Sequence, residues 1–168
     1  MSTAINFLKQ LDGYTPEAAF ESFQRAAIKS GVYCFGFDME YDETNTAKGG
    51  QGALCEMDQA TLMTFDTFDS QKIKRFLFRV NVPGKSDYDS FTWLVNDPNY
   101  FESIYIKNPC SYDEGEFIFR FVVSYFGDNP NDYLWYDSAD DDFYYTAEDI
   151  KKLSTMPYNP SWYSKKLV

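Results

Sequence analysis

The spacing of apolar residues changes at Gly31 from the period of a helix to the period of a strand. Before this point, Thr15 suits the N-cap of a helix, Pro16 suits its first position, and Gly31 can end it. From Val32 to Asp42, the odd positions are all apolar or aromatic, and the later even positions, Asp38, Glu40 and Asp42, are acidic. Such alternation indicates a strand with one face toward the core and the other toward solvent. The sequence therefore predicts a helix that leads directly into a strand.

Further strand candidates follow along the chain. They span residues 53–66, 76–82, 91–95, 100–106, 117–126, 133–137 and 143–146. The segment 117–126 is apolar on both phases, which predicts a central strand covered on both faces. Residues 2–11 carry apolar side chains at helical spacing and predict a short helix. Thr146 is placed to cap a short closing helix.

We therefore expect a single α+β domain over residues 1–168, because helices come first, then a run of strands, then a helix. N-terminal helices would pack on a mainly antiparallel twisted sheet of about five to seven strands, with a short C-terminal helix. The polar, glycine-rich residues at about 43–52 predict a flexible loop. Pro157 and Pro160 predict an irregular tail at about 155–168.

The balance of charged residues limits the functions open to the chain. It has 15 Lys and Arg against 26 Asp and Glu, no histidine, and a net charge of −11. Because nucleic-acid binding needs a positive surface, we expect no direct nucleic-acid partner. Mechanisms that use a histidine base or ligand are excluded. We also expect no membrane partner, because anionic lipid would repel the chain and its longest apolar run is too short to cross a bilayer.

The three cysteines, Cys34, Cys55 and Cys110, are widely spaced and odd in number, so they do not predict a disulfide framework. We expect small buried thiols, and the sequence leaves open whether Cys34 and Cys55 lie close together. The N-terminus lacks a basic region followed by an apolar run, which a signal peptide requires. These features predict a soluble, cytoplasmic protein.

Aromatic and acidic residues are concentrated between positions 128 and 149, where eight carboxylates occur without any lysine or arginine. One interpretation is a binding surface in which rigid aromatic side chains supply contact area and acids attract a basic partner. The alternative is a hairpin whose aromatic residues face the core and whose acidic tip stays hydrated. The candidate partner-binding residues here are Trp135, Tyr136, Asp137, Asp140, Asp141, Asp142, Tyr144 and Tyr145.

A second candidate partner-binding surface is the acidic stripe formed by Asp38, Glu40 and Asp42. Same-face residues on a strand lie roughly 6.6 Å apart, so these carboxylates would form a regular negative line. If this strand pairs with the next one as a long hairpin, Glu56 and Asp58 could join the same face, which depends on the register. The alternative is an ordinary solvated face of an antiparallel sheet.

No motif in the chain points to catalysis. The carboxylates at positions 137 and 140–142 do not fit the spacing of a calcium-binding EF-hand loop. Paired carboxylates can hydrolyse glycosides, but with 26 acids in the chain any pair can be nominated. The glycine-rich stretch 49–52 is not followed by the Lys and Ser or Thr of a phosphate-binding loop. We therefore expect no catalytic residue, no metal site and no cofactor.

These observations predict a non-catalytic, acidic protein-binding module. The most concrete version is an inhibitor or immunity-type protein that occludes a basic protein partner, such as a nuclease toxin or another nucleic-acid-handling protein. In overall character the chain resembles small cytoplasmic immunity and antidefence proteins, which are often compact, acidic and non-catalytic. Two alternatives are an accessory or structural interaction subunit and a small-ligand or carbohydrate-binding domain.

Overall fold

The computed structural model describes residues 4–56, 75–83, 99–107, 115–137, 143–163 and 165–168. Within them, three helices and seven strands form the α+β fold that the sequence predicts. In chain order these elements are β1 (Ala4–Gln10), α1 (Pro16–Ser30), β2 (Tyr33–Tyr41), β3 (Ala47–Cys55), β4 (Arg75–Val80), β5 (Tyr100–Lys107), α4 (Gly115–Asp128), β6 (Tyr133–Asp137), β7 (Phe143–Thr146) and α5 (Ala147–Ser154).

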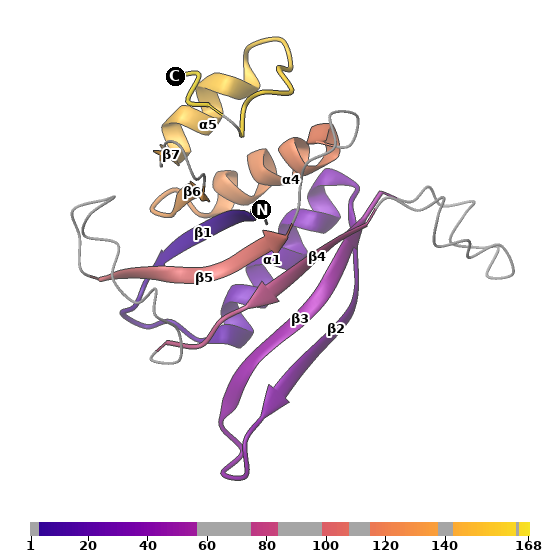
Figure 1. Cartoon of the computed structure of the whole chain (residues 1–168), viewed down its shortest axis with the longest axis vertical. Helices are drawn as coiled ribbons and strands as arrows, with labels where there is room; N and C mark the ends of the chain where they lie inside the picture. The colour runs from indigo at the N-terminus through magenta and orange to yellow at the C-terminus, as the bar shows by residue number, and fades with distance from the viewer. Residues whose placement is uncertain (1–3, 57–74, 84–98, 108–114, 138–142, 164) are drawn as a thin grey trace, which may run out of the picture.

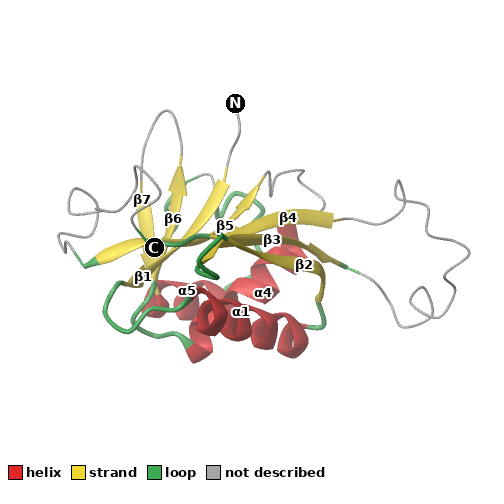
Figure 2. Ribbon diagram, turned by 90° about the horizontal axis from the view of Figure 1, so that it is seen from below, coloured by secondary structure: helices red, strands yellow, loops and turns green. Residues whose placement is uncertain are grey.

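The seven strands form one antiparallel sheet in the order β2-β3-β4-β5-β1-β6-β7. The first strand of the chain therefore lies inside the sheet, because β2 to β5 form neighbours on one side of it and β6 and β7 on the other. Helices α1, α4 and α5 all lie on one face of the sheet (Figure 1, Figure 2). The predicted strand at 91–95 and residues 57–66 of another fall outside the described residues.

The strand registers align side chains into rows, and successive rows face opposite sides of the sheet. Phe7 of β1 lies on the helix-covered face, where its ring contacts Phe23 of α1 and Phe121 and Tyr125 of α4. The row through Phe7 is Met39, Gly50, Val80, Ile104, Phe7, Leu134 and Tyr145. The next row, on the other face, is Asp38, Gln51, Arg79, Tyr105, Asn6, Trp135 and Tyr144. The larger apolar cluster thus lies between the sheet and the helices, and a smaller one, which includes Leu8, Tyr100 and Trp135, lies on the other face.

The predicted ends of α1 and the predicted start of α5 are confirmed. Thr15 accepts a hydrogen bond from the amide of Ala18, and Gly31 ends α1 in the left-handed region at a φ of 72°. Thr146 begins α5 with a capping box, in which its side chain and that of Asp149 each accept a hydrogen bond from the other residue's amide.

The predicted strand over residues 117–126 is wrong, because this segment belongs to helix α4. The helix is apolar on nearly all sides because it is covered twice. Phe121 faces the core beneath the sheet, whereas Phe119 lies on the outer side, where its ring is 5.2 Å from Trp162 and 5.8 Å from Tyr158 of the C-terminal segment. A helix buried on both sides loses the one-sided apolar stripe that identifies a surface helix.

The predicted helix over residues 2–11 is also wrong, because residues 4–10 form β1. Ile5 and Leu8 fit a helical spacing, but the consecutive residues Phe7 and Leu8 are both fully buried, in two different apolar clusters. A strand inside a sheet can bury both of its faces. The neighbouring strands that favour β1 lie far away in the chain, so local spacing does not reveal them.

The connection between β2 and β3 is shorter than the loop predicted at about 43–52, because β3 begins at Ala47. Gly50 and Gly52 lie within the strand beneath aromatic rings. A Cβ atom at Gly50 would lie 2.7 Å from Cζ of Phe37, and one at Gly52 would lie 2.8 Å from Cζ of Phe78. These glycines make room for the rings, so here they indicate close packing and not a loop.

Candidate functional site

The acidic stripe of β2 lies on the face of the sheet that the helices leave uncovered. Asp38 and Glu40 are exposed there, and β2 is the first strand in the sheet order. Neither carboxylate forms an ion pair or a side-chain hydrogen bond within the described residues. Next to them, Tyr41 exposes 50% of its surface. Asp38 and Glu40 therefore form an exposed negative stripe on the first strand of the sheet order, and their role in partner binding stays a prediction.

The β2–β3 connection extends this acidic surface beyond the rest of the sheet. Strand β4 pairs with β3 only over residues 50–55, so the turn end of the hairpin extends past β4 (Figure 1). We refer to residues 38–48 as the acidic hairpin. Its charged residues are Asp38, Glu40, Asp42, Glu43 and Lys48, which give a net charge of −3.

Asp42 holds the turn of the acidic hairpin. Its Oδ1 accepts hydrogen bonds from the amide of Thr44 at 2.9 Å, the hydroxyl of Thr44 at 2.7 Å and the amide of Thr46 at 2.9 Å. Asn45 adopts a positive φ of 61°, which is a common turn conformation for asparagine. Asp42 therefore has a structural role in the turn, in addition to its negative charge.

Glu56 does not join the acidic stripe. The register pairs Cys55 with Tyr33, which places Glu56 at the end of the hairpin opposite the turn. Its carboxylate lies 3.2 Å from the guanidinium of Arg120 on α4. The possible grouping of these carboxylates on one face is therefore wrong for Glu56, and Asp58 lies outside the described residues.

Three of the four candidate aromatic residues on β6 and β7 belong to the interior. Trp135, Tyr136 and Tyr145 expose only 4%, 8% and 1% of their surfaces. The hydroxyl of Tyr145 donates to the carbonyl of Trp162 at 2.7 Å, which ties the C-terminal segment to β7. Buried side chains cannot offer accessible contact area, so the interpretation of these three residues as partner-contacting anchors is corrected.

The fourth aromatic residue, Tyr144, is half-buried on the helix-free face. Its ring meets that of Tyr133 edge to face, with the centroids 5.4 Å apart, and the ammonium group of Lys166 lies 5.1 Å from its centroid. Asp137 ends β6, and the other three acidic candidates, Asp140, Asp141 and Asp142, lie outside the described residues. Their role in partner binding stays a prediction.

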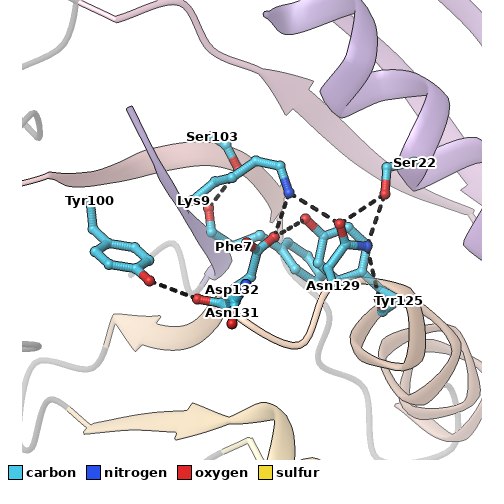
Figure 3. A network of polar contacts seen from close by, with 9 residues as sticks. All are labelled: Phe7, Lys9, Ser22, Tyr100, Ser103, Tyr125, Asn129, Asn131 and Asp132. Atoms are coloured by element: carbon cyan, nitrogen blue, oxygen red, sulfur yellow. Dashed lines mark hydrogen bonds and ion pairs between the residues drawn. The ribbon is translucent and has the colours of Figure 1, made fainter. Parts of the chain in front are cut away.

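A buried polar network that sequence patterns did not reveal joins β1, α1 and α4 (Figure 3). The ammonium group of Lys9 donates to Oδ2 of Asp132 at 2.8 Å and to Oδ1 of Asn129 at 3.1 Å. The hydroxyl of Tyr125 donates to the same Asp132 oxygen at 2.7 Å. The side-chain amide of Asn129 donates to the hydroxyl of Ser22 on α1 at 2.8 Å. The network thus fixes the turn after α4 against β1 and α1.

Burial sets the ionisation of this network. It raises the pKa of Asp132 despite the opposing effect of the Lys9 ammonium group. Burial also raises the pKa of Tyr125 well above its ordinary value, with a further contribution from the Asp132 charge. The Lys9 ammonium group and the Tyr125 hydroxyl group thus supply two hydrogen-bond donors to Oδ2 of the Asp132 carboxylate. No local sequence pattern links Lys9 and Asp132, because the two residues are 123 positions apart.

An open cleft of about 250 Å³ lies beside the network. Its lining includes Lys9, Asp12, Tyr14, Asn131 and Asp132. The hydroxyl of Tyr14 is already used, because it donates to the carbonyl of Asn81 at 2.8 Å. Oδ1 of Asp132 accepts no hydrogen bond in the described part of the chain. The cleft can therefore offer a small polar ligand one carboxylate oxygen beside a lysine ammonium group.

The two cysteines that the structure describes, Cys34 and Cys55, are free thiols. Burial raises the pKa of Cys34 to about 12, with a smaller contribution from the neighbouring Cys55, whose own pKa is also raised by burial. A thiol nucleophile must ionise, so both are poorly suited to nucleophilic chemistry at neutral pH. Cys55 is buried as predicted, whereas Cys34 is only partly buried; Cys110 lies outside the described residues.

The described residues offer no group of three or more Asp, Glu, Cys or His arranged to hold a metal ion. None of the helices described is long and apolar enough to cross a lipid bilayer. Comparisons with protein-family models, with curated proteins and with solved structures found no match to the chain.

Proposed function

We propose that this chain is a non-catalytic protein-binding module that recognises a basic protein through the acidic hairpin. The observation that carries the proposal is the state of Asp38 and Glu40, which are exposed, unpaired within the described residues and located on an edge strand. An inhibitor or immunity-type protein that occludes a basic cleft, such as that of a nuclease toxin, is the most concrete version of this function.

The electrostatics of the whole chain support the same proposal. A net charge of −11 produces a negative field around the molecule, and complementary fields raise the association rate of oppositely charged proteins. The acidic hairpin extends past β4, so its charges can approach a concave basic surface before the rest of the molecule does. Binding of this kind weakens as salt is added, because ions screen exposed charges.

Affinity capture with matched variants tests the proposal. The protein is immobilised, exposed at low salt to a lysate of the cells that produce it, and eluted with a salt gradient, after which bound proteins are identified by mass spectrometry. The test variant is Asp38→Asn with Glu40→Gln. The control is Glu17→Gln with Glu21→Gln, which removes the same number of charges from exposed positions of α1.

We expect a basic protein to be retained by the wild type and by the α1 control, eluted early by salt, and lost from the hairpin variant. Equal retention by all three proteins, or no specific partner, contradicts the proposal. A further variant, Asp137→Asn with Asp140→Asn and Asp142→Asn, tests whether these predicted acidic residues contribute. Loss of binding by that variant alone would move the binding site from the acidic hairpin to that segment.

A second candidate function, small-ligand binding, is favoured by the cleft beside Lys9 and Asp132. Ligand binding to the folded state raises its stability, by about 2.7 kcal/mol at a ligand concentration 100 times Kd. A thermal-shift screen with small polar metabolites and monosaccharides, repeated on Lys9→Met, measures this effect. A ligand that stabilises the wild type and not the variant supports this function, whereas a flat screen argues against it.

A further inference from the structure

The outer edge of β2 offers backbone hydrogen-bonding groups as well as charge. In a strand, the N–H and C=O groups of alternate residues point to opposite sides. Strand β3 pairs with one side of β2, and within the described residues no strand pairs with the other side. Over residues 38–41, β2 therefore directs part of its backbone donors and acceptors away from the sheet.

The two faces of β2 differ in chemistry at this edge. Asp38 and Glu40 lie exposed on the helix-free face. Phe37 and Met39 lie on the helix-covered face and are only partly buried, with the ring of Phe37 stacked on that of Phe20 of α1 at a centroid distance of 3.6 Å. A strand added next to β2 would continue both faces, because side chains alternate along it with the same period.

We propose that the partner binds by adding one extended strand to the edge of β2, with cationic and apolar side chains in alternation. Lys or Arg side chains of that strand lie beside Asp38 and Glu40, and its apolar side chains extend the partly buried surface of Phe37 and Met39. This inference rests on the proposed function and specifies how the partner is held. Backbone hydrogen bonds to β2 fix the register of the added strand, and the charges of Asp38 and Glu40 select the sequence of that strand.

Charged residues on an edge strand also protect a sheet against edge-to-edge aggregation, and a β-bulge serves the same purpose. β2 has such an irregularity in its pairing between Phe35 and Asp38, where Gly36 has a φ of 65°. The bulge lies before the acidic residues, and regular pairing with β3 resumes from Asp38 to Glu40. The negative charges of Asp38 and Glu40 repel other acidic edge strands, but they attract a basic strand.

The experiment uses the whole chain, labelled with nitrogen-15, and a synthetic peptide probe at low salt. The probe has about seven residues of alternating lysine and valine, which is a typical strand length. Two further peptides carry N-methyl groups, one on all lysine amides and the other on all valine amides. Both keep the full positive charge, but each loses the hydrogen-bond donors along one edge of the strand.

We expect the parent peptide to shift the amide resonances of β2 and to bind the Asp38→Asn, Glu40→Gln variant more weakly than the Glu17→Gln, Glu21→Gln control. One methylated peptide should lose about tenfold in affinity and the other should bind like the parent, because only one set of amides can face β2. Equal affinity of the two methylated peptides, or a parent peptide that leaves the β2 resonances unchanged, overturns strand addition.

These results are separable from the test of the proposed function. If the hairpin variant loses the captured basic protein while the two methylated peptides behave alike, the acidic hairpin binds through charge alone and only strand addition is wrong. If the hairpin variant keeps the captured protein and the parent peptide does not bind, both proposals are wrong.

Discussion

Replacing Asp132 with alanine should destabilise the protein through the groups left behind. Tyr125 is fully buried and would lose the only acceptor of its hydroxyl group among the described residues, at a cost of about 1–3 kcal/mol. The loss of the Lys9 ion pair should cost less, because the Lys9 side chain is 22% exposed and keeps its hydrogen bond to Asn129. Exposed ion pairs contribute about 1 kcal/mol or less to stability. Burial of the Asp132 carboxylate is itself unfavourable, as its raised pKa indicates. Its replacement by alanine removes this unfavourable contribution and so offsets part of the lost stability.

The net expectation for Asp132→Ala is a loss of about 2 kcal/mol in the free energy of unfolding. For a chain of this size, that corresponds to a fall of roughly 4–8 °C in Tm. Urea unfolding of Asp132→Ala, Tyr125→Phe and the double variant measures the coupling between the two residues. Because Tyr125→Phe removes the orphaned hydroxyl group, the double variant should be more stable than the sum of the single effects by about 1 kcal/mol. Additive effects would refute this account of the network.

Three further predictions concern two glycines, the titration of Asp132 and the cap of α5. Gly50→Ala should lower the free energy of unfolding by about 2 kcal/mol, because its Cβ would lie 2.7 Å from Cζ of Phe37. Gly127→Ala should instead raise it by about 0.5 kcal/mol, because a Cβ there meets no atom within 4 Å and alanine favours the helix α4. Urea unfolding of the two variants measures both changes. Burial raises the pKa of Asp132 above its unfolded value, so its contribution to stability is present at low pH and is lost as the pH rises from about 4 through the folded pKa. Asp132→Asn should remove this part of the pH dependence, and unfolding midpoints of both proteins from pH 4 to 7 check it. Thr146→Ala should cost about 1 kcal/mol by removing the cap of α5, and calorimetry that shows no change in Tm would contradict it.

The parts of the fold that the sequence predicts correctly are those specified by neighbouring residues. Helix α1 carries its own cap, its Pro16 and its terminal Gly31, so its ends follow from local chemistry alone. From Phe37 to Glu40, strand β2 shows its two faces as an alternation of apolar and acidic residues, whereas the bulge between Phe35 and Asp38 breaks the predicted alternation before this point. The acidic stripe at Asp38 and Glu40 could be predicted for the same reason.

The errors arise where distant parts of the chain decide the environment. Helix α4 appeared to be a strand because the sheet covers one side of it and Trp162 and Tyr158 cover the other. The aromatic residues of β6 appeared available for binding because the sequence does not show that Trp135 and Tyr136 face buried surroundings. The Lys9–Asp132 pair joins the first strand to the turn before β6, and no local pattern links two such residues.

The most direct test of the proposed function is the association rate constant of the captured basic partner, measured by stopped-flow fluorescence at low and high salt. If the acidic hairpin guides binding, the wild-type rate constant falls by about tenfold or more between the two conditions. The Asp38→Asn, Glu40→Gln variant should then associate more slowly at low salt and show a weaker salt dependence, while the Glu17→Gln, Glu21→Gln control resembles the wild type. Identical rate constants and identical salt dependence for the two variants would contradict the central claim that these two carboxylates of β2 contact the partner.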